Sequence, residues 1–145
     1  MLLRMLPEQV SDQWEAIRPG IESSLPYKVS EHNMNMLLEE FMIGNMHCWV
    51  LEEDDNIYAI ITTKFSVDIM DRKNMVVFSV FGYRPATVDM WVESYNSLSR
   101  WAVANGCVSM VGQFDNETAE SIVNNFNVSS TMSIVSIDLH KKEEL

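Results

Sequence analysis

Cysteine and histidine are scarce in this chain. Only Cys48 and Cys107 occur among 145 residues, without a CxxC pair or an even framework, so neither a disulfide scaffold nor a zinc module is indicated. The three histidines, His32, His47 and His140, show no metal-ligand spacing and no Ser/His/Asp arrangement. His47 and Cys48 would point to opposite faces of a strand, which makes a dyad between them sterically poor. We therefore expect no metal site and no nucleophilic dyad.

Basic residues are also few. Lys and Arg number 10 against 21 Asp and Glu, for a formal net charge of −11. This balance disfavours phosphate-driven binding to nucleic acid or to an anionic membrane, and it is compatible with simple solubility or with a basic protein partner. No apolar run reaches the roughly 18 residues of a membrane span, and the one at the N-terminus is too short for a signal peptide. We expect a cytoplasmic protein with no nucleic-acid or membrane partner.

Low-complexity tracts, repeats and Gly/Ser/Pro-rich linkers are missing as well. The chain has only five glycines and four prolines, and no composition shift marks a boundary. Hydrophobic residues make up 47% of the chain, and 145 residues suffice to bury a core without staples. The sequence therefore predicts one globular domain over residues 1–145.

Apolar side chains at a helical period predict two helices in the first third of the chain. The first begins at Pro7, which suits the first turn of a helix, and ends at Pro19-Gly20. The second has Ser30 as its N-cap and Gly44-Asn45 as its stop. The stripes comprise Val10, Trp14 and Ile17 in the first helix, and Met34, Leu37, Leu38 and Phe41 in the second.

The period then changes to that of strands, predicted at residues 46–51, 57–69 and 75–81. The acidic turn Glu52–Asn56 joins the first two as a hairpin, and Asp71–Asn74 leads into the third. Residues 75–81 form a nearly continuous apolar run, which is typical of a central strand buried on both faces. Three antiparallel strands result.

The second half of the chain predicts further alternation of helix and strand. Thr87 caps a helix that ends at Asn105-Gly106, a strand follows at 107–111, Asn116 caps another helix, and 132–139 alternates as a last strand. The passage from 75–81 through a helix into 107–111 predicts a parallel strand pair. The helix after Thr87 should face the sheet with Val88, Trp91, Val92, Tyr95, Leu98 and Ala102. The core should include Phe41, Val77, Phe78, Val80, Leu98, Ile122 and Ile137.

This α/β order, (β)-α-α-β-β-β-α-β-α-β, is similar to the GNAT (Gcn5-related N-acetyltransferase) fold, in which a mostly antiparallel mixed sheet holds a parallel central pair. Leu2–Leu6 is the one candidate for the first strand. Residues 101–107, WAVANGC, look like the W-A-x-x-x-G-C junction of small phage- and prophage-encoded GNAT-like proteins, and residues 46–50 resemble their first hairpin strand. Residues 116–128 resemble the family's N-x-x-A-x-x-L-Y-x-x-x-G-F segment, with Asn116, Ala119 and Ile122 on pattern.

The resemblance implies an acetyl-CoA-dependent N-acyltransferase, with strand backbone around Val77 to Val80 pairing with the pantetheine. In the family, a Q/R-x-x-G-x-G/A loop then binds the pyrophosphate. In this chain the pyrophosphate would be bound by Gly82, Arg84 and the start of the helix at Thr87. However, Thr87 and Asp89 stand at the two positions where the family's loop has glycine or alanine. The predicted phosphate loop is thus degenerate.

The residues expected to carry the chemistry depart from the family too. Val123 stands where catalytic members have a proton-donating tyrosine, which leaves Tyr83 and Tyr95 as weak candidates, and strand 75–81 carries no carboxylate. The alternative is a non-catalytic GNAT-like module, a protein-interaction or structural virion component that oligomerises or assembles with other phage proteins in the host cytoplasm or the virion.

Overall fold

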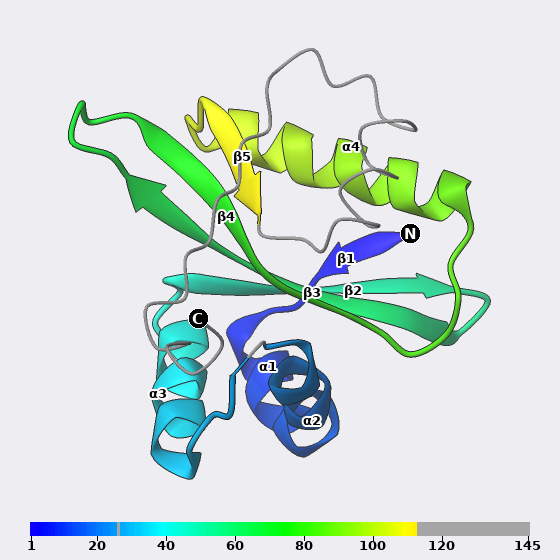
Figure 1. Cartoon of the computed structure of the whole chain (residues 1–145). Coiled ribbons are helices and arrows are strands. Elements are labelled where there is room, and N and C mark those ends of the chain that lie inside the picture. The colour runs from blue at the N-terminus through cyan, green and yellow to red at the C-terminus, as the bar shows by residue number, and fades with distance from the viewer. Residues whose placement is uncertain (26, 113–145) are drawn as a thin grey trace, which may run out of the picture. The chain divides into compact units, whose positions relative to one another are not determined.

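The computed structural model of the protein describes residues 1–25 and 27–112 (Figure 1). In chain order the elements are β1 (Leu2–Arg4), α1 (Pro7–Asp12), α2 (Trp14–Ser24), α3 (Glu31–Met42), β2 (Met46–Glu53), β3 (Asn56–Val67), β4 (Lys73–Gly82), α4 (Val88–Ala104) and β5 (Ser109–Gly112). The strands form one sheet in the order β1-β2-β3-β4-β5. Neighbouring strands are antiparallel except β4 and β5, which run parallel. The predicted α/β fold with a mixed sheet and a parallel pair is confirmed.

Part of the sequence prediction lies outside the described residues. This applies to the helix from Asn116, to the strand at 132–139 and to the core residues Ile122 and Ile137. The described residues fall in one compact unit, Met1–Gly112. A single domain over 1–145 therefore stays a prediction.

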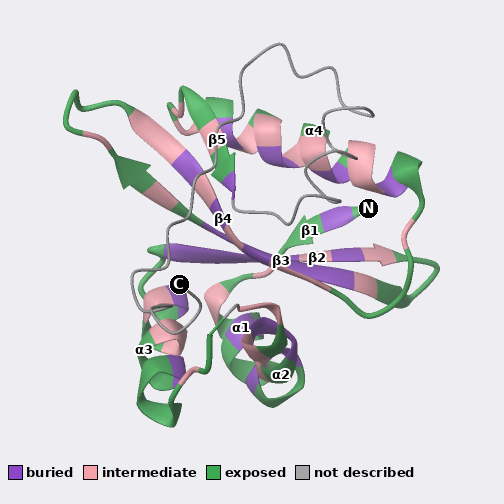
Figure 2. Ribbon diagram, in the orientation of Figure 1, coloured by how far each residue is buried: buried purple, intermediate pink, exposed green. Residues whose placement is uncertain are grey.

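Helices cover both faces of the sheet (Figure 1). Helix α4 lies on one face, and α1, α2 and α3 lie on the other, where α2 packs on β4 and α3 packs on β2. Purple ribbon marks the buried residues, which form runs along β2 and β3 (Figure 2). The buried cluster on the three-helix face comprises Val10, Trp14, Ile17, Ile21, Met34, Phe41, Met46, Cys48 and Ile60.

The first predicted helix is wrong at its end. The helix is interrupted at Gln13, which separates α1 from α2. Helix α2 then continues through Pro19 and Gly20 to Ser24. An interior proline normally costs a helix a hydrogen bond. Here the segment beyond it places Ile21, 1% exposed, in the core, so burial offsets that cost. Local breaker residues were overridden by tertiary packing.

Helix α3 and the first hairpin follow the sequence closely. The Ser30 hydroxyl accepts the Asn33 N–H at 3.1 Å, and Gly44 takes a φ of +85° after the helix. Asp54 and Asp55 also have positive φ, at 52° and 64°, and they form the tight turn between β2 and β3. The next turn lies two residues earlier than predicted, because β3 already ends at Val67 and Lys73 and Asn74 already belong to β4.

The predicted apolar stripe of α4 is rotated relative to the observed one. Its buried residues are Met90, Ser94, Leu98 and Ala102, whereas Val88 is exposed and Trp91, Val92 and Tyr95 are half-buried. Ser94 tolerates burial because its hydroxyl donates to the Met90 carbonyl at 2.9 Å. Thr87 is the N-cap, as predicted.

The core prediction held for Phe41, Val77 and Leu98, which are buried. Phe78 and Val80 are instead half-buried. Both lie on β4 at and beyond the end of the short β5 ladder, so the strand is less enclosed there than its apolar run suggested. Within residues 1–25 and 27–112, no helix combines the length and the apolar character that a bilayer crossing requires.

Candidate functional site

The second half of β4 departs from regular strand pairing on both of its sides. On its β3 side, Thr62 pairs with Ser79 but Thr63 pairs with Val77, so Phe78 is an extra residue that forms a β-bulge. On its other side, the parallel ladder with β5 ends at the Val77 and Gly112 pair. Within the described residues, the edge of β4 from Phe78 to Gly82 therefore has no strand partner. Such an edge can hydrogen-bond an extended ligand.

A buried hydroxyl pair supports the bulge. Thr62 Oγ1 and Ser79 Oγ hydrogen-bond across β3 and β4, on the face covered by α2. Since both side chains are buried, each satisfies the other where water is excluded. The pair fixes the register on one side of Phe78.

The unpaired edge leads directly to the start of α4. Gly82 ends β4, and after the turn Thr87 caps the helix, its hydroxyl accepting the Met90 N–H at 3.2 Å. The first N–H groups of a helix have no intrahelical partner, so the positive end of the helix dipole points toward this turn. Asp89 already occupies the first turn and opposes a bound anion.

The Arg84 side chain lies over the ring of Tyr58. Its guanidinium carbon is 5.3 Å from the centroid of the Tyr58 ring, and the residue lines a groove of about 900 Å³ on the three-helix face. The groove runs between α1 and α2 and the ends of β1, β2 and β3. Its role in binding phosphate stays a prediction.

The charge of this groove is mainly negative. Three carboxylates line it, those of Asp12, Glu52 and Asp55. Arg4 also lines it, but its guanidinium lies over the Trp101 ring at 5.3 Å, on the other face of the sheet. Of the described residues that line the groove, Arg84 is the remaining cation. An acidic groove favours a ligand that carries ammonium groups.

The two candidate tyrosines occupy different surroundings. Tyr83 lines the groove, and its ring meets Phe81 edge to face with centroids 5.0 Å apart. Burial, and to a lesser degree the nearby Cys48 thiol, raise the pKa of Tyr83, so its hydroxyl stays protonated at neutral pH. Tyr95 is half-buried on α4. Of the two, only Tyr83 lines the groove.

Close packing of α2 on β4 positions Tyr83. A Cβ added to Gly20 would lie 2.8 Å from Phe81 Cδ1 and 3.2 Å from the Tyr83 hydroxyl. Glycine therefore lets the helix backbone approach the strand.

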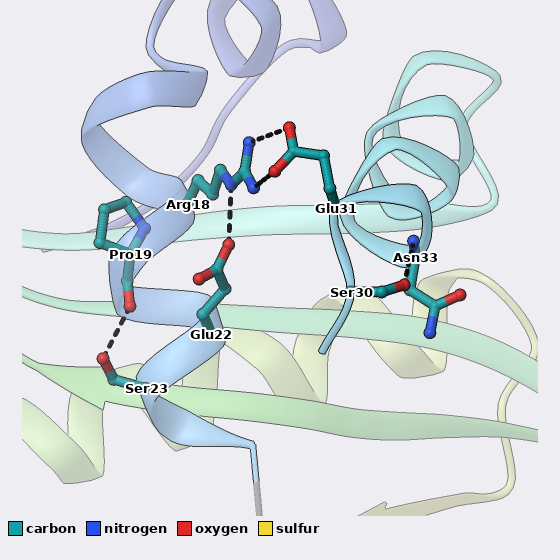
Figure 3. A network of polar contacts seen from close by, with 7 residues as sticks. All are labelled: Arg18, Pro19, Glu22, Ser23, Ser30, Glu31 and Asn33. Carbon is teal, nitrogen blue, oxygen red and sulfur yellow. Dashed lines mark hydrogen bonds and ion pairs between the residues drawn. The ribbon is translucent and has the colours of Figure 1, made fainter. Parts of the chain in front are cut away.

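A charged network ties α2 to the start of α3 (Figure 3). The Arg18 guanidinium donates a hydrogen bond to the Glu22 carboxylate at 2.7 Å and further hydrogen bonds to both carboxylate oxygens of Glu31. This geometry raises the pKa of Arg18 and lowers the pKa of Glu31. The network restrains the helix that carries Gly20.

Sequence reasoning placed Val77, Val80, Gly82, Arg84 and Thr87 along one strand and its exit. The structure puts them in that order, with Val77 and Val80 on either side of the bulge. The groove could not be predicted from the sequence, because Asp12 and its neighbours on α1 look like an ordinary solvated helix face. No local signal distinguishes them. Among the described residues, no group of three or more metal-ligating side chains gathers in one place.

Comparison with known proteins finds likeness in structure alone. No protein-family model matches the sequence, and no curated protein matches it. A solved structure described as a probable acetyltransferase superposes with a TM-score of 0.70 at 10% identity, covering 96% of this chain and 97% of that one. AAC(6')-Iy, in complex with the bisubstrate analog CoA-S-monomethyl-acetylneamine, gives 0.69 at 12% identity, covering 95% and 96%.

A third similar structure is a predicted acetyltransferase with acetyl-CoA from Clostridium acetobutylicum. Its TM-score is 0.64 at 10% identity, and the match covers 96% of both chains. Identities this low show the fold alone. The chain has a GNAT-like fold, as the resemblance implied.

Proposed function

We propose that this protein is an acetyl-CoA-dependent N-acetyltransferase whose acceptor is a cationic amine. The observation that carries the proposal is the edge of β4 between the bulge at Phe78 and Gly82, which leads into the start of α4. Acetyl-CoA would supply the thioester that is the acetyl donor. Structural neighbours described as acetyltransferases, two of them with acetyl-CoA or a CoA analog, support this reading.

The residues present fit such a donor in part. Backbone groups of β4 can pair with the amides of an extended pantetheine, and the N-terminus of α4 can face its phosphates. Asp89 acts against the phosphates, and the Arg84–Asp89 turn lacks the glycines that would let more backbone N–H groups approach. We therefore expect weak donor binding.

The acceptor would lie in the acidic groove. Carboxylates of Asp12, Glu52 and Asp55 can bind ammonium groups and take up the proton that an attacking amine releases. Tyr83, protonated in the groove wall, is the candidate to return a proton to the leaving thiolate. Catalysis would otherwise be positioning, since β4 offers no carboxylate.

Donor binding is tested by calorimetric titration of the full chain with acetyl-CoA. Asp89→Asn removes a negative charge from the first turn of α4, so it should tighten binding about twofold to fivefold. Glu93→Gln, one turn further along, is the matched control and should change little. Arg84→Ala tests whether that cation reaches the phosphates. Heats equal to dilution for wild type and Asp89→Asn would remove the proposal.

Turnover is followed as free thiol released from acetyl-CoA with a panel of amines. Multiply charged amines should be acetylated faster than monoamines, and Asp12→Asn should reduce this preference. Tyr83→Phe should lower kcat with little change in KM if the hydroxyl protonates the thiolate. Equal kcat in both proteins would exclude that role.

A non-catalytic module is the second candidate. Asp89 in the first turn of α4 and the lack of a carboxylate on β4 favour it. In that case the fold would serve as a docking body in a phage assembly, and wild type and Asp89→Asn would both fail to bind acetyl-CoA.

A further inference from the structure

A smaller cavity of about 250 Å³ opens where β1 leaves the sheet. β1 pairs with β2 through Arg4 and Trp49, and the last bond joins the Met5 N–H to the Cys48 carbonyl at 2.8 Å. The chain then turns into α1, and the start of β2 stays without β1 alongside it. The cavity forms around this stretch of β2.

This cavity lies across the sheet from the edge of β4 considered above, because it opens beside β2 and β3 runs between β2 and β4. It is lined by Met46 and His47 at the start of β2 and by Trp101 and Asn105 at the end of α4. The β4 edge leads instead to the start of α4. Although Arg4 and Met5 touch both the cavity and the groove, the guanidinium of Arg4 lies on the cavity's side, over Trp101.

Aromatic rings form much of the wall. Phe65 stacks on Trp101 with centroids 5.0 Å apart and an interplanar angle of 18°, and the His47 ring meets Trp101 edge to face at 4.6 Å. Phe41, which is 1% exposed, closes the three-helix side. An apolar cavity of about 150 Å³ is enough to hold benzene, so this one has room for a single ring with a small substituent.

The cavity carries one positive charge at neutral pH. Among the described residues, no carboxylate lines it. Burial and the nearby Arg4 lower the pKa of His47, which leaves that ring neutral, and burial raises the pKa of Cys48 to about 12, which leaves it a thiol. Arg4 has no ion-pair partner within the described residues, although the chain has a net charge of −11. An anionic group is the complement the cavity lacks.

We propose that this cavity is a second ligand site, which binds a small aromatic carboxylate with its ring among Phe41, Phe65 and Trp101 and its carboxylate on the Arg4 guanidinium. A guanidinium can bind a carboxylate through two parallel hydrogen bonds while its face stays on an aromatic ring. The site is independent of acetyl-CoA and does not rest on the proposed activity. A molecule bound there would contact residues of β1, α1, α3 and α4 at the same time.

Benzoate and its neutral isostere benzamide are the probes, titrated into the full chain by NMR and calorimetry. Benzoate should bind about tenfold more tightly than benzamide, because only benzoate pairs with Arg4. The indole resonance of Trp101 and the ring resonances of His47 should shift, and the pKa of His47 should rise in the complex. Excess acetyl-CoA should not displace benzoate.

Arg4→Gln should abolish the preference for benzoate while benzamide binding persists. Arg100→Gln is the matched control, since it removes the same charge from an exposed position beside Trp101. Urea unfolding checks that both variants fold. The proposal is overturned if benzoate gives no signal up to about 10 mM, where even a weak millimolar site fills. Equal affinity for both probes, an equal loss in both variants, or shifts confined to Tyr83 and Thr87 would overturn it as well.

Discussion

Replacing Gly20 with alanine tests whether the packing of α2 on β4 is as close as the structure shows. The new methyl would lie 2.8 Å from Phe81 Cδ1 and 3.3 Å from its Cγ, so the ring or the helix must move. Overpacking of this kind costs about 1–3 kcal/mol. Alanine also favours the helix over glycine by about 0.5–1 kcal/mol. The net expectation is a loss of about 0.5–2 kcal/mol in the free energy of unfolding.

Urea unfolding followed by circular dichroism measures that free energy. For a chain of this size each kcal/mol corresponds to about 2–4 °C in Tm, so thermal melts give an independent check. Ala16→Gly at an exposed position of the same helix is the control, because it reports the helix propensity difference without the steric clash.

A second variant identifies the clashing group. In a Phe81→Leu background the ring atoms are gone, so the cost of Gly20→Ala should largely disappear and the two changes should be non-additive. If Gly20→Ala is neutral or stabilising with Phe81 intact, the ring yields freely. The reasoning about Gly20 would then be wrong.

Three further predictions test the structure elsewhere. Gly44→Ala and Gly106→Ala, at φ values of +85° and +81° with no neighbour within 4 Å of an added Cβ, should each cost about 1 kcal/mol in urea unfolding through backbone strain alone; no loss would contradict the left-handed caps. Burial, and then the charges of Arg4 and Lys73, lower the pKa of His47 below its ordinary value of 6.5 in the folded protein, so the unfolded chain takes up the proton first as the pH falls. Stability should therefore fall as pH drops below 6.5, with a shallower slope in His47→Asn; identical slopes would refute this. Thr62→Val leaves the buried Ser79 hydroxyl without a partner and should cost about 1–3 kcal/mol, whereas adding Ser79→Ala should recover part of it.

Local patterns predicted most of the elements. The caps Ser30 and Thr87 begin their helices where expected, and Gly44 and Gly106 follow the ends of theirs in the left-handed conformation. The parallel pairing of β4 with β5 also followed from a strand, a helix and a second strand in sequence. Each of these features depends on residues close together in the chain, on side-chain periodicity or on a topological rule.

The errors arose where distant residues compete with local preference. Pro19 and Gly20 look like a helix end, but α2 runs through them because Ile21 is buried and Gly20 fits against Phe81. The bulge at Phe78 was equally invisible, since it depends on how β3 and β4 align. Proline and glycine in a helix interior cost about 3 and about 1 kcal/mol, and the burial of Trp14, Ile17 and Ile21 on α2, at about 1.5–3 kcal/mol each, outweighs that sum.

Sequence by itself determined most of the described helices and strands, their order and the acidic charge of this protein. Tertiary structure alone decided the sites: the acidic groove, where Asp12 of α1 meets Glu52 of β2, and the cavity, where Arg4 faces Trp101 from 97 positions away. Periodicity and capping act within a few residues, so they are readable along the chain. Charge complementarity and cavity shape act through space, and they exist only after the sheet has brought those residues together.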